Sequence, residues 1–261
     1  MKPINVWLTP DGYRYLAVSE KRVIKPFHLR WFLPFVLKDN LQAWAWVTRL
    51  SIVGFAILTA VYCQNPWMVS VALLPGIVFS WKCPVLVDAF GMFLALLACV
   101  LLPIYWPAAV AVALLAGCVR ETAPIWSAIY AWNPILLVGM IPVAIRWLQK
   151  EGPDVLDEKG LWIVKHPFKA SKEFHAGKWM SPQLMLTPWA GLILGLGAMT
   201  PQLFLALLLA YSQLLIATDS VRLYQWATPV LALATCSLLP VWAIPFVAVS
   251  IVFNPWKGDG I

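Results

Sequence analysis

Seven charged residues lie in or close to apolar and aromatic stretches of the chain, where charged groups are uncommon. They are Asp11, Arg30, Arg49, Lys82, Asp88, Arg120 and Glu121. Two of them, Arg120 and Glu121, are adjacent in the stretch GCVRETAPIWSAIYAWNP. The planar guanidinium group of arginine binds phosphate through paired hydrogen bonds, and a carboxylate can act as general base towards a hydroxyl group. Together, these residue types suit a substrate that carries a lipid-linked phosphate.

Several of these charges also have a purely structural explanation. Arg120 ends one expected helix and Glu121 begins the next, so each complements a helix dipole close to the lipid headgroups. Asp11 is a favourable residue in a first helical turn, and Lys82 suits an anchor at the membrane interface. Both explanations are open for these four residues.

The composition is typical of an integral membrane protein. Of the 261 residues, 61% are hydrophobic and 12% are charged, and the mean hydropathy is +0.77. Soluble domains contain about 45–50% apolar and about 25% charged residues. Asp88 and Arg49 fall inside expected membrane spans, where a charged side chain costs about 2.5–3.5 kcal/mol and usually faces the bundle interior or a cavity. Arg49 could instead extend towards the interface. We expect a multi-pass protein of the cell or cytoplasmic membrane, surrounded by the lipid bilayer.

The first 40 residues are basic and aromatic rather than continuously apolar. Thr9 and Pro10 form a helix-start signal, which predicts a short helix from about 10 to 20. The next stretch, PFHLRWFLPFVL, is amphipathic and is interrupted by Pro34. We expect residues 1–40 to form an amphipathic segment that lies in the membrane interface.

Eight apolar segments follow this interfacial segment, and they predict an all-α fold, a polytopic transmembrane helical bundle of about eight spans. They cover about 41–62, 66–81, 84–103, 106–119, 124–145, 186–199, 201–218 and 228–253. A full span needs about 20 residues, so the shorter segments are expected to be tilted, re-entrant or buried among their neighbours. Asn133-Pro134 should kink the fifth span.

Hydrophilic stretches divide the chain into four parts. These are an interfacial segment (1–40), a first helical bundle (41–145), a surface loop (146–185) and a second group of spans (186–261). The alternation of spans places residues 1–40, the turn at Lys82 and the turn at Arg120 on one face of the membrane. Residues 1–40 and 146–180 each contain seven Lys and Arg residues, so the positive-inside rule does not select an orientation.

The cysteines and histidines predict neither a metal site nor a cofactor. The five cysteines (Cys63, Cys83, Cys99, Cys118 and Cys236) are never spaced as CxxC, and we interpret them as small apolar side chains. The three histidines are scattered and form no ligand cluster. The net charge of +7 suits anionic lipid or an anionic substrate, and no sequence feature indicates a nucleic-acid partner.

The N-terminal stretch PDGYRYLAVSEKRVIKPFHLRWFLPFVL resembles the first external loop of GT-C-type membrane glycosyltransferases, which use polyprenyl-phosphate sugars. In many of these enzymes an Asp is followed within a few residues by a Tyr and an apolar helix. An Arg-x-x-x-Pro element then leads into the next span. The matching positions are Asp11, Tyr15, and Arg30 with Pro34.

An Arg-Glu pair that opens a later helix also occurs in such proteins, and Arg120-Glu121 is similar to it. The resemblance implies a reduced GT-C-like glycosyltransferase with Asp11 as catalytic base and a polyprenyl-phosphate-linked sugar as substrate. It also implies that the N-terminus lies on the external side. Together with the charges above, the candidate residues for binding the substrate and its lipid phosphate are Arg30, Arg49, Lys82, Asp88, Arg120 and Glu121.

The main alternative is a non-catalytic membrane scaffold, an assembly factor or a subunit of a larger membrane complex. The stretch GLILGLGAMT places Gly191 and Gly195 at the small-xxx-small spacing that allows close helix packing, as in contact with a membrane-protein partner or in a homo-oligomer. A small transporter ranks third, because no inverted repeat is visible. The enzyme hypothesis predicts that Asp11→Asn abolishes transfer. The scaffold hypothesis predicts instead that Gly191→Leu disrupts a complex.

Overall fold

The computed structural model describes residues 7–156, 168, 185–215, 222 and 224–254. Every regular element in this described part is a helix, which confirms the all-α prediction. The chain divides into two compact units. Unit 1 comprises residues 1–58 and 80–158, and unit 2 comprises residues 59–79 and 159–261.

The N-terminal part of unit 1 consists of short helices. They are α1 (Pro10–Ala17), η1 (Val18–Glu20), η2 (Phe27–Leu29) and α2 (Phe32–Leu37). Thr9 caps α1, because its Oγ1 accepts a hydrogen bond from the backbone N–H of Gly12 at 3.2 Å. The predicted helix from about 10 to 20 is confirmed as α1 continued by η1.

Helix α3 (Leu41–Tyr62) has 22 residues and is long and apolar enough to cross a membrane. It is the only helix of the described chain that meets this criterion; the other apolar helices have at most 17 residues. One face of α3 is buried, whereas the opposite face exposes large apolar side chains at Trp46, Leu50, Val53, Ile57 and Val61. The expected number of about eight spans therefore stays a prediction.

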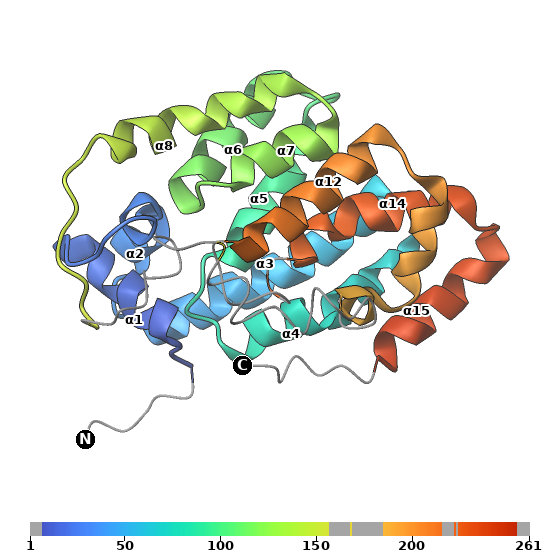
Figure 1. Cartoon of the computed structure of the whole chain (residues 1–261), viewed down its shortest axis with the longest axis horizontal. Coiled ribbons are helices and arrows are strands. Elements are labelled where there is room, and N and C mark those ends of the chain that lie inside the picture. The colour runs from blue at the N-terminus through green and yellow to red at the C-terminus, as the bar shows by residue number, and fades with distance from the viewer. Residues whose placement is uncertain (1–6, 157–167, 169–184, 216–221, 223, 255–261) are drawn as a thin grey trace. The chain divides into compact units, whose positions relative to one another are not determined.

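The helical core of unit 1 follows the segment Pro84–Val87. It consists of α5 (Asp88–Leu101), α6 (Trp106–Val119), α7 (Ala123–Ala131), η4 (Pro134–Gly139) and α8 (Met140–Trp147), and α5, α6 and α7 lie side by side (Figure 1). Small side chains allow this close packing, since Ala98, Ala109 and Ala113 form a buried cluster with Leu136.

The expected fifth span is broken where the sequence predicted a kink. Helix α7 ends at Trp132, whose φ of 50° is left-handed. The Asn133 side chain then caps η4 by accepting a hydrogen bond from the backbone N–H of Ile135 at 3.0 Å. The expected span 66–81 is likewise divided, into η3 (Pro66–Leu73) and α4 (Pro75–Lys82).

Unit 2 is built around η6, which packs against α14 and α15. Its elements after the loop are η6 (Thr187–Ala198), α12 (Pro201–Ser212), η7 (Gln213–Leu215), η8 (Gln225–Ala227), α14 (Thr228–Leu238), η9 (Val241–Ala243) and α15 (Ile244–Val252). A Cβ atom at Gly191 would meet the hydroxyl of Ser250, and one at Gly195 would meet Thr235. The small-xxx-small spacing is therefore used inside unit 2. Most of the expected surface loop 146–185 lies outside the described residues.

Candidate functional site

Arg30 and Glu121 form a two-pronged ion pair between segments that are distant in sequence. Arg30 follows η2, and Glu121 lies in the turn between α6 and α7. The Nε and Nη2 groups of Arg30 each donate to a carboxylate oxygen of Glu121 at 2.6 Å. The remaining Nη1 group donates to the hydroxyl of Tyr15, also at 2.6 Å. All three nitrogen atoms of the Arg30 guanidinium group therefore donate hydrogen bonds to side chains of unit 1.

This pair is fixed in its charged state. Burial alone would raise the pKa of Glu121, but the charge and hydrogen bonds of Arg30 overcome it and lower that pKa to about 2. Burial would by itself lower the pKa of Arg30, but the negative charge of Glu121 outweighs this effect and raises that pKa above its usual value. The Tyr15 hydroxyl is fully buried, which raises its pKa to about 12 and keeps it protonated.

Arg120 and Asp88 form a second ion pair directly beside the first. Asp88 lies in the first turn of α5 and its side chain is fully buried, and Arg120 is the C-cap of α6. The Nη1 group of Arg120 contacts Oδ1 of Asp88. Because Arg120 and Glu121 are consecutive, the two ion pairs are neighbours in one charge network.

Arg14 forms the third ion pair, with Asp154. Its Nη2 group lies 2.9 Å from Oδ2 of Asp154, and its Nε group lies 3.1 Å from Oδ1. Asp11 is farther away, with Oδ1 at 3.9 Å from Nη1 of Arg14. Tyr15 belongs to the same group, since its hydroxyl accepts a hydrogen bond from Nη1 of Arg30 at 2.6 Å. We call these charged residues and Tyr15 the charge network: Asp11, Arg14, Tyr15, Arg30, Asp88, Arg120, Glu121 and Asp154.

Asp11 is the most accessible carboxylate of the charge network. Its side chain is 25% exposed, against 18% for Glu121, 9% for Asp154 and 0% for Asp88. Asp88, Asp154 and Glu121 are in close contact with their arginines, and Oδ1 of Asp11 lies 3.9 Å from Nη1 of Arg14. A carboxylate that acts as general base must reach the substrate, and Asp11 meets this condition best.

The chain after α8 fastens the N-terminal segment of unit 1. Arg146 donates to the backbone carbonyl of His28 at 2.8 Å, and the backbone N–H of Lys25 donates to Glu151 at 3.1 Å. The backbone N–H of Gly152 donates to Val23 at 3.2 Å. These bonds hold the segment that follows η1, and the Arg14–Asp154 pair holds helix α1, which carries Asp11.

Arg49 and Lys82 are not in the charge network. The guanidinium carbon of Arg49 lies 5.7 Å from the ring centre of Trp7 and 5.5 Å from that of Trp81. Lys82 follows Trp81 in sequence and is exposed. We call Trp7, Arg49, Trp81 and Lys82 the Arg49 group.

The structure thus brings five of the seven predicted charges into one network and leaves two outside it. Sequence reasoning missed the contributions of Arg14 and Asp154, and also the tryptophans of the Arg49 group. Arg14 could have been found from its position three residues after Asp11 on one helix face. No sequence pattern connects Arg14 with Asp154, which lies 140 residues away.

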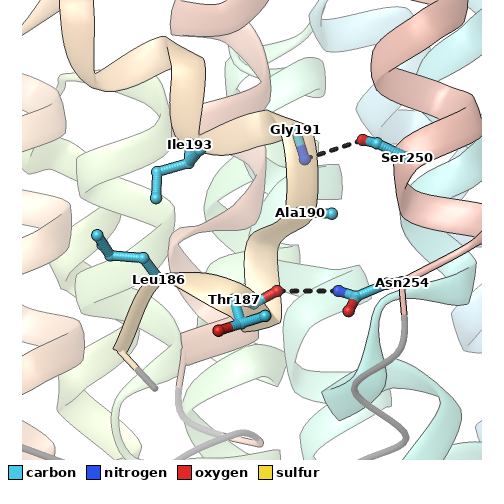
Figure 2. A pocket seen from close by; sticks show the side chains of 7 residues that line it. All are labelled: Leu186, Thr187, Ala190, Gly191, Ile193, Ser250 and Asn254. Atoms are coloured by element: carbon cyan, nitrogen blue, oxygen red, sulfur yellow. Dashed lines mark hydrogen bonds between the residues drawn. The ribbon is translucent and has the colours of Figure 1, made fainter. Parts of the chain in front are cut away.

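Unit 2 contains an open pocket of about 310 Å³ that none of the predicted site residues lines (Figure 2). Its wall is mostly apolar, with Leu186 and Ile193 pointing into it. Its polar groups are already hydrogen-bonded: Ser250 accepts from the N–H of Gly191, and Asn254 donates to the carbonyl of Thr187. None of the described residues that line the pocket has a titratable side chain, so the charge network is the better candidate.

Among the described residues, no group of three or more His, Cys, Asp and Glu side chains could hold a metal ion. Comparisons of the chain with protein-family models, with curated proteins and with solved structures found no match.

Proposed function

We propose that this protein is a multi-pass membrane glycosyltransferase of the GT-C-like kind, in which Asp11 is the general base. The observation that carries this proposal is the accessibility of Asp11 beside three closely paired arginine–carboxylate couples. The resemblance of the N-terminal stretch to the first external loop of such enzymes supports the same residue. The substrate class is a sugar linked to polyprenyl phosphate.

The membrane location is supported by the composition and by the surface of the helices. Helix α3 exposes a continuous row of large apolar side chains, and α15 exposes Phe246, Val249 and Val252. Contiguous apolar surface of this kind is unfavourable in water and favourable against lipid. Kinked helices that are individually short can together span the hydrocarbon region, which is about 30 Å thick.

The proposed reaction is a displacement at the anomeric carbon of the donor sugar. The acceptor hydroxyl oxygen forms a bond to this carbon, and the bond from carbon to the phosphate oxygen breaks. Polyprenyl phosphate leaves with the bonding electron pair, and Asp11 accepts the proton of the acceptor hydroxyl. General base catalysis of this kind contributes about 10²–10⁴-fold to a rate.

The paired residues of the network have a positioning role in this proposal. Arg30, Glu121 and Tyr15 connect the segment after η2, the turn before α7 and helix α1. Asp88 and Arg120 connect the beginning of α5 with the end of α6. Direct binding of a donor phosphate by these arginines stays a prediction, and it would compete with their carboxylate partners.

The experiment is a transfer assay with the variant Asp11→Asn in membranes that contain the protein. The donors are polyprenyl-phosphate mannose and polyprenyl-phosphate glucose with labelled sugars, and the readout is loss of label from the lipid extract. We expect Asp11→Asn to reduce the rate at least about 100-fold. The control variant Asp39→Asn, which makes the same chemical change at an exposed residue outside the charge network, should retain the wild-type rate.

A non-catalytic scaffold is the second candidate, and the mutual neutralisation of three arginines by three carboxylates favours it. Native mass spectrometry of the protein in mild detergent separates the two. Co-purified polyprenyl phosphate supports the transferase. A stable protein partner without that lipid, together with unchanged transfer by Asp11→Asn, would instead establish the scaffold.

A further inference from the structure

Arg49 lies inside α3, the helix that is long enough to cross a membrane, and well away from its first residue. It is the ninth residue of α3, about 12 Å along the axis from Leu41 at 1.5 Å per residue. By contrast, the three arginines of the charge network, Arg14, Arg30 and Arg120, form ion pairs with carboxylates. No ion pair in the described part of the chain involves Arg49 or Lys82.

The two tryptophans beside Arg49 stabilise its positive charge, but they provide no acceptor for its N–H groups. The indole rings of Trp7 and Trp81 attract the cation through their faces. A ring face does not replace an oxygen acceptor in the guanidinium plane, where five N–H groups point outward. The Nε group of Arg49 is buried and has no hydrogen-bond partner within the described structure.

The Arg49 group is held in place by its neighbours. Thr48 donates from its hydroxyl to the backbone carbonyl of Pro84 at 2.6 Å, which ties α3 to the chain two residues after Lys82. Gly12 approaches the carbonyl of Val85, which brings the first turn of α1 to the same segment. Arg49 therefore lies against two indole rings, and the exposed Lys82 follows one of them in sequence.

We propose that Trp7, Arg49, Trp81 and Lys82 bind the phosphate headgroup of an anionic membrane lipid. A phosphate supplies oxygen acceptors in the plane of the guanidinium group, and Lys82 adds a second positive charge. Tryptophan rings are favourable at the level of the headgroups, where one side is apolar and the other is polar. The inference depends on the membrane location and not on transfer activity. A donor lipid with a phosphate would fit by the same chemistry.

The test is native mass spectrometry of the intact protein in mild detergent, titrated with phosphatidic acid, phosphatidylcholine or inorganic phosphate. We expect wild type to retain phosphatidic acid at least about tenfold more tightly than phosphatidylcholine. Arg49→Gln should abolish this preference, and Lys82→Gln should reduce it. Arg22→Gln, which removes an exposed cation outside the group, should leave it unchanged.

Two further variants keep the inference testable if Arg49→Gln fails to fold. Arg49→Lys keeps the charge but removes the planar donors, and Trp81→Leu removes one ring; each should weaken phosphatidic acid binding. Competition by inorganic phosphate would show that the group recognises phosphate alone, whereas its failure to compete would assign the whole lipid. Equal retention of both lipids by wild type, or an unchanged preference in Arg49→Gln, would overturn the inference. Asp11→Asn should preserve lipid binding, which separates this result from the transferase proposal.

Discussion

At the scale of residues, the charges that composition would exclude from lipid are mostly compensated within the protein. Arg30 places all three guanidinium nitrogens on Glu121 and Tyr15, and Arg120 pairs with the fully buried Asp88. A buried ion pair stabilises a fold little more than apolar side chains of the same size would. Removal of one partner, however, leaves an uncompensated buried charge and destabilises the protein. These pairs therefore specify how the helix ends meet.

The first residue-scale prediction concerns the stability of the Arg30 pair. Glu121→Gln should lower the free energy of unfolding in detergent by about 3–5 kcal/mol, because it leaves the charge of Arg30 buried and unpaired. Denaturant or thermal unfolding of the purified protein measures this loss. Glu20→Gln is the matched control, since Glu20 pairs with Arg22 on the exposed surface and should change stability by no more than about 1 kcal/mol. Equal losses in the two variants would contradict a structural role for the buried pair.

The second residue-scale prediction concerns pH. The pKa of Glu121 is about 2 in the folded protein, against a usual value of 4.5. A folded pKa below the unfolded one stabilises the protein above pH 4.5, and this contribution is lost as the pH falls from 4.5 towards 2. Melting temperature measured across this window should decline more steeply for wild type than for Glu121→Gln. Parallel curves would show that other carboxylates account for the acid sensitivity.

At the scale of elements, backbone contacts through glycine hold the core of unit 1 together. A Cβ atom at Gly117 of α6 would overlap the carbonyl of Gly139 at the end of η4. The same logic applies in unit 2, where Gly195 lies against Thr235 of α14. The glycines that suggested contact with a partner therefore serve packing between helices of one chain.

The element-scale prediction is that Gly117→Ala destabilises unit 1 by about 1–3 kcal/mol, because α6 and η4 must move apart. Gly197→Ala is the control, since its added methyl group meets only the flexible end of Leu238. Thermal unfolding in detergent compares the two variants. A melting temperature for Gly117→Ala equal to that of Gly197→Ala would show that the helices can adjust without cost.

At the scale of the whole molecule, the exposed apolar row of α3 provides a test of the proposed membrane location. Leu50 and Val53 lie near the middle of this helix and are exposed. In water an exposed apolar residue tolerates replacement by lysine, and against lipid the same change is costly.

Val53→Lys should therefore reduce membrane insertion of α3 by about 2.5–3.5 kcal/mol, the cost of a lysine at the centre of a span. A glycosylation reporter placed on either side of residues 41–62 measures the inserted fraction. Gln42→Lys, at the start of α3, should have little effect, because that position lies near the interface. Unchanged insertion of Val53→Lys would indicate that this face does not contact lipid.

The sequence by itself determined the helical class, the cap at Thr9 and the break at Asn133, because proline geometry and side-chain capping are local. It also singled out Asp11, Arg30, Asp88, Arg120 and Glu121 as candidate residues for catalysis and for binding a lipid-linked phosphate. Only the tertiary structure decided how these charges pair, since Arg30 and Glu121 lie 91 residues apart in the sequence. The pair of Arg14 and Asp154, which the sequence did not indicate, joins residues 140 apart.

The same limit applies to the helix lengths and to the candidate site. Apolar runs such as 124–145 indicate burial or lipid, but hydropathy does not reveal that α7, η4 and α8 divide the run into separate pieces. Exposure likewise depends on the packing of α1 against its neighbours, which leaves Asp11 accessible while Asp88 is fully buried. A linear sequence specifies which groups carry charge, and only the packed helices decide which of those charges can meet a substrate.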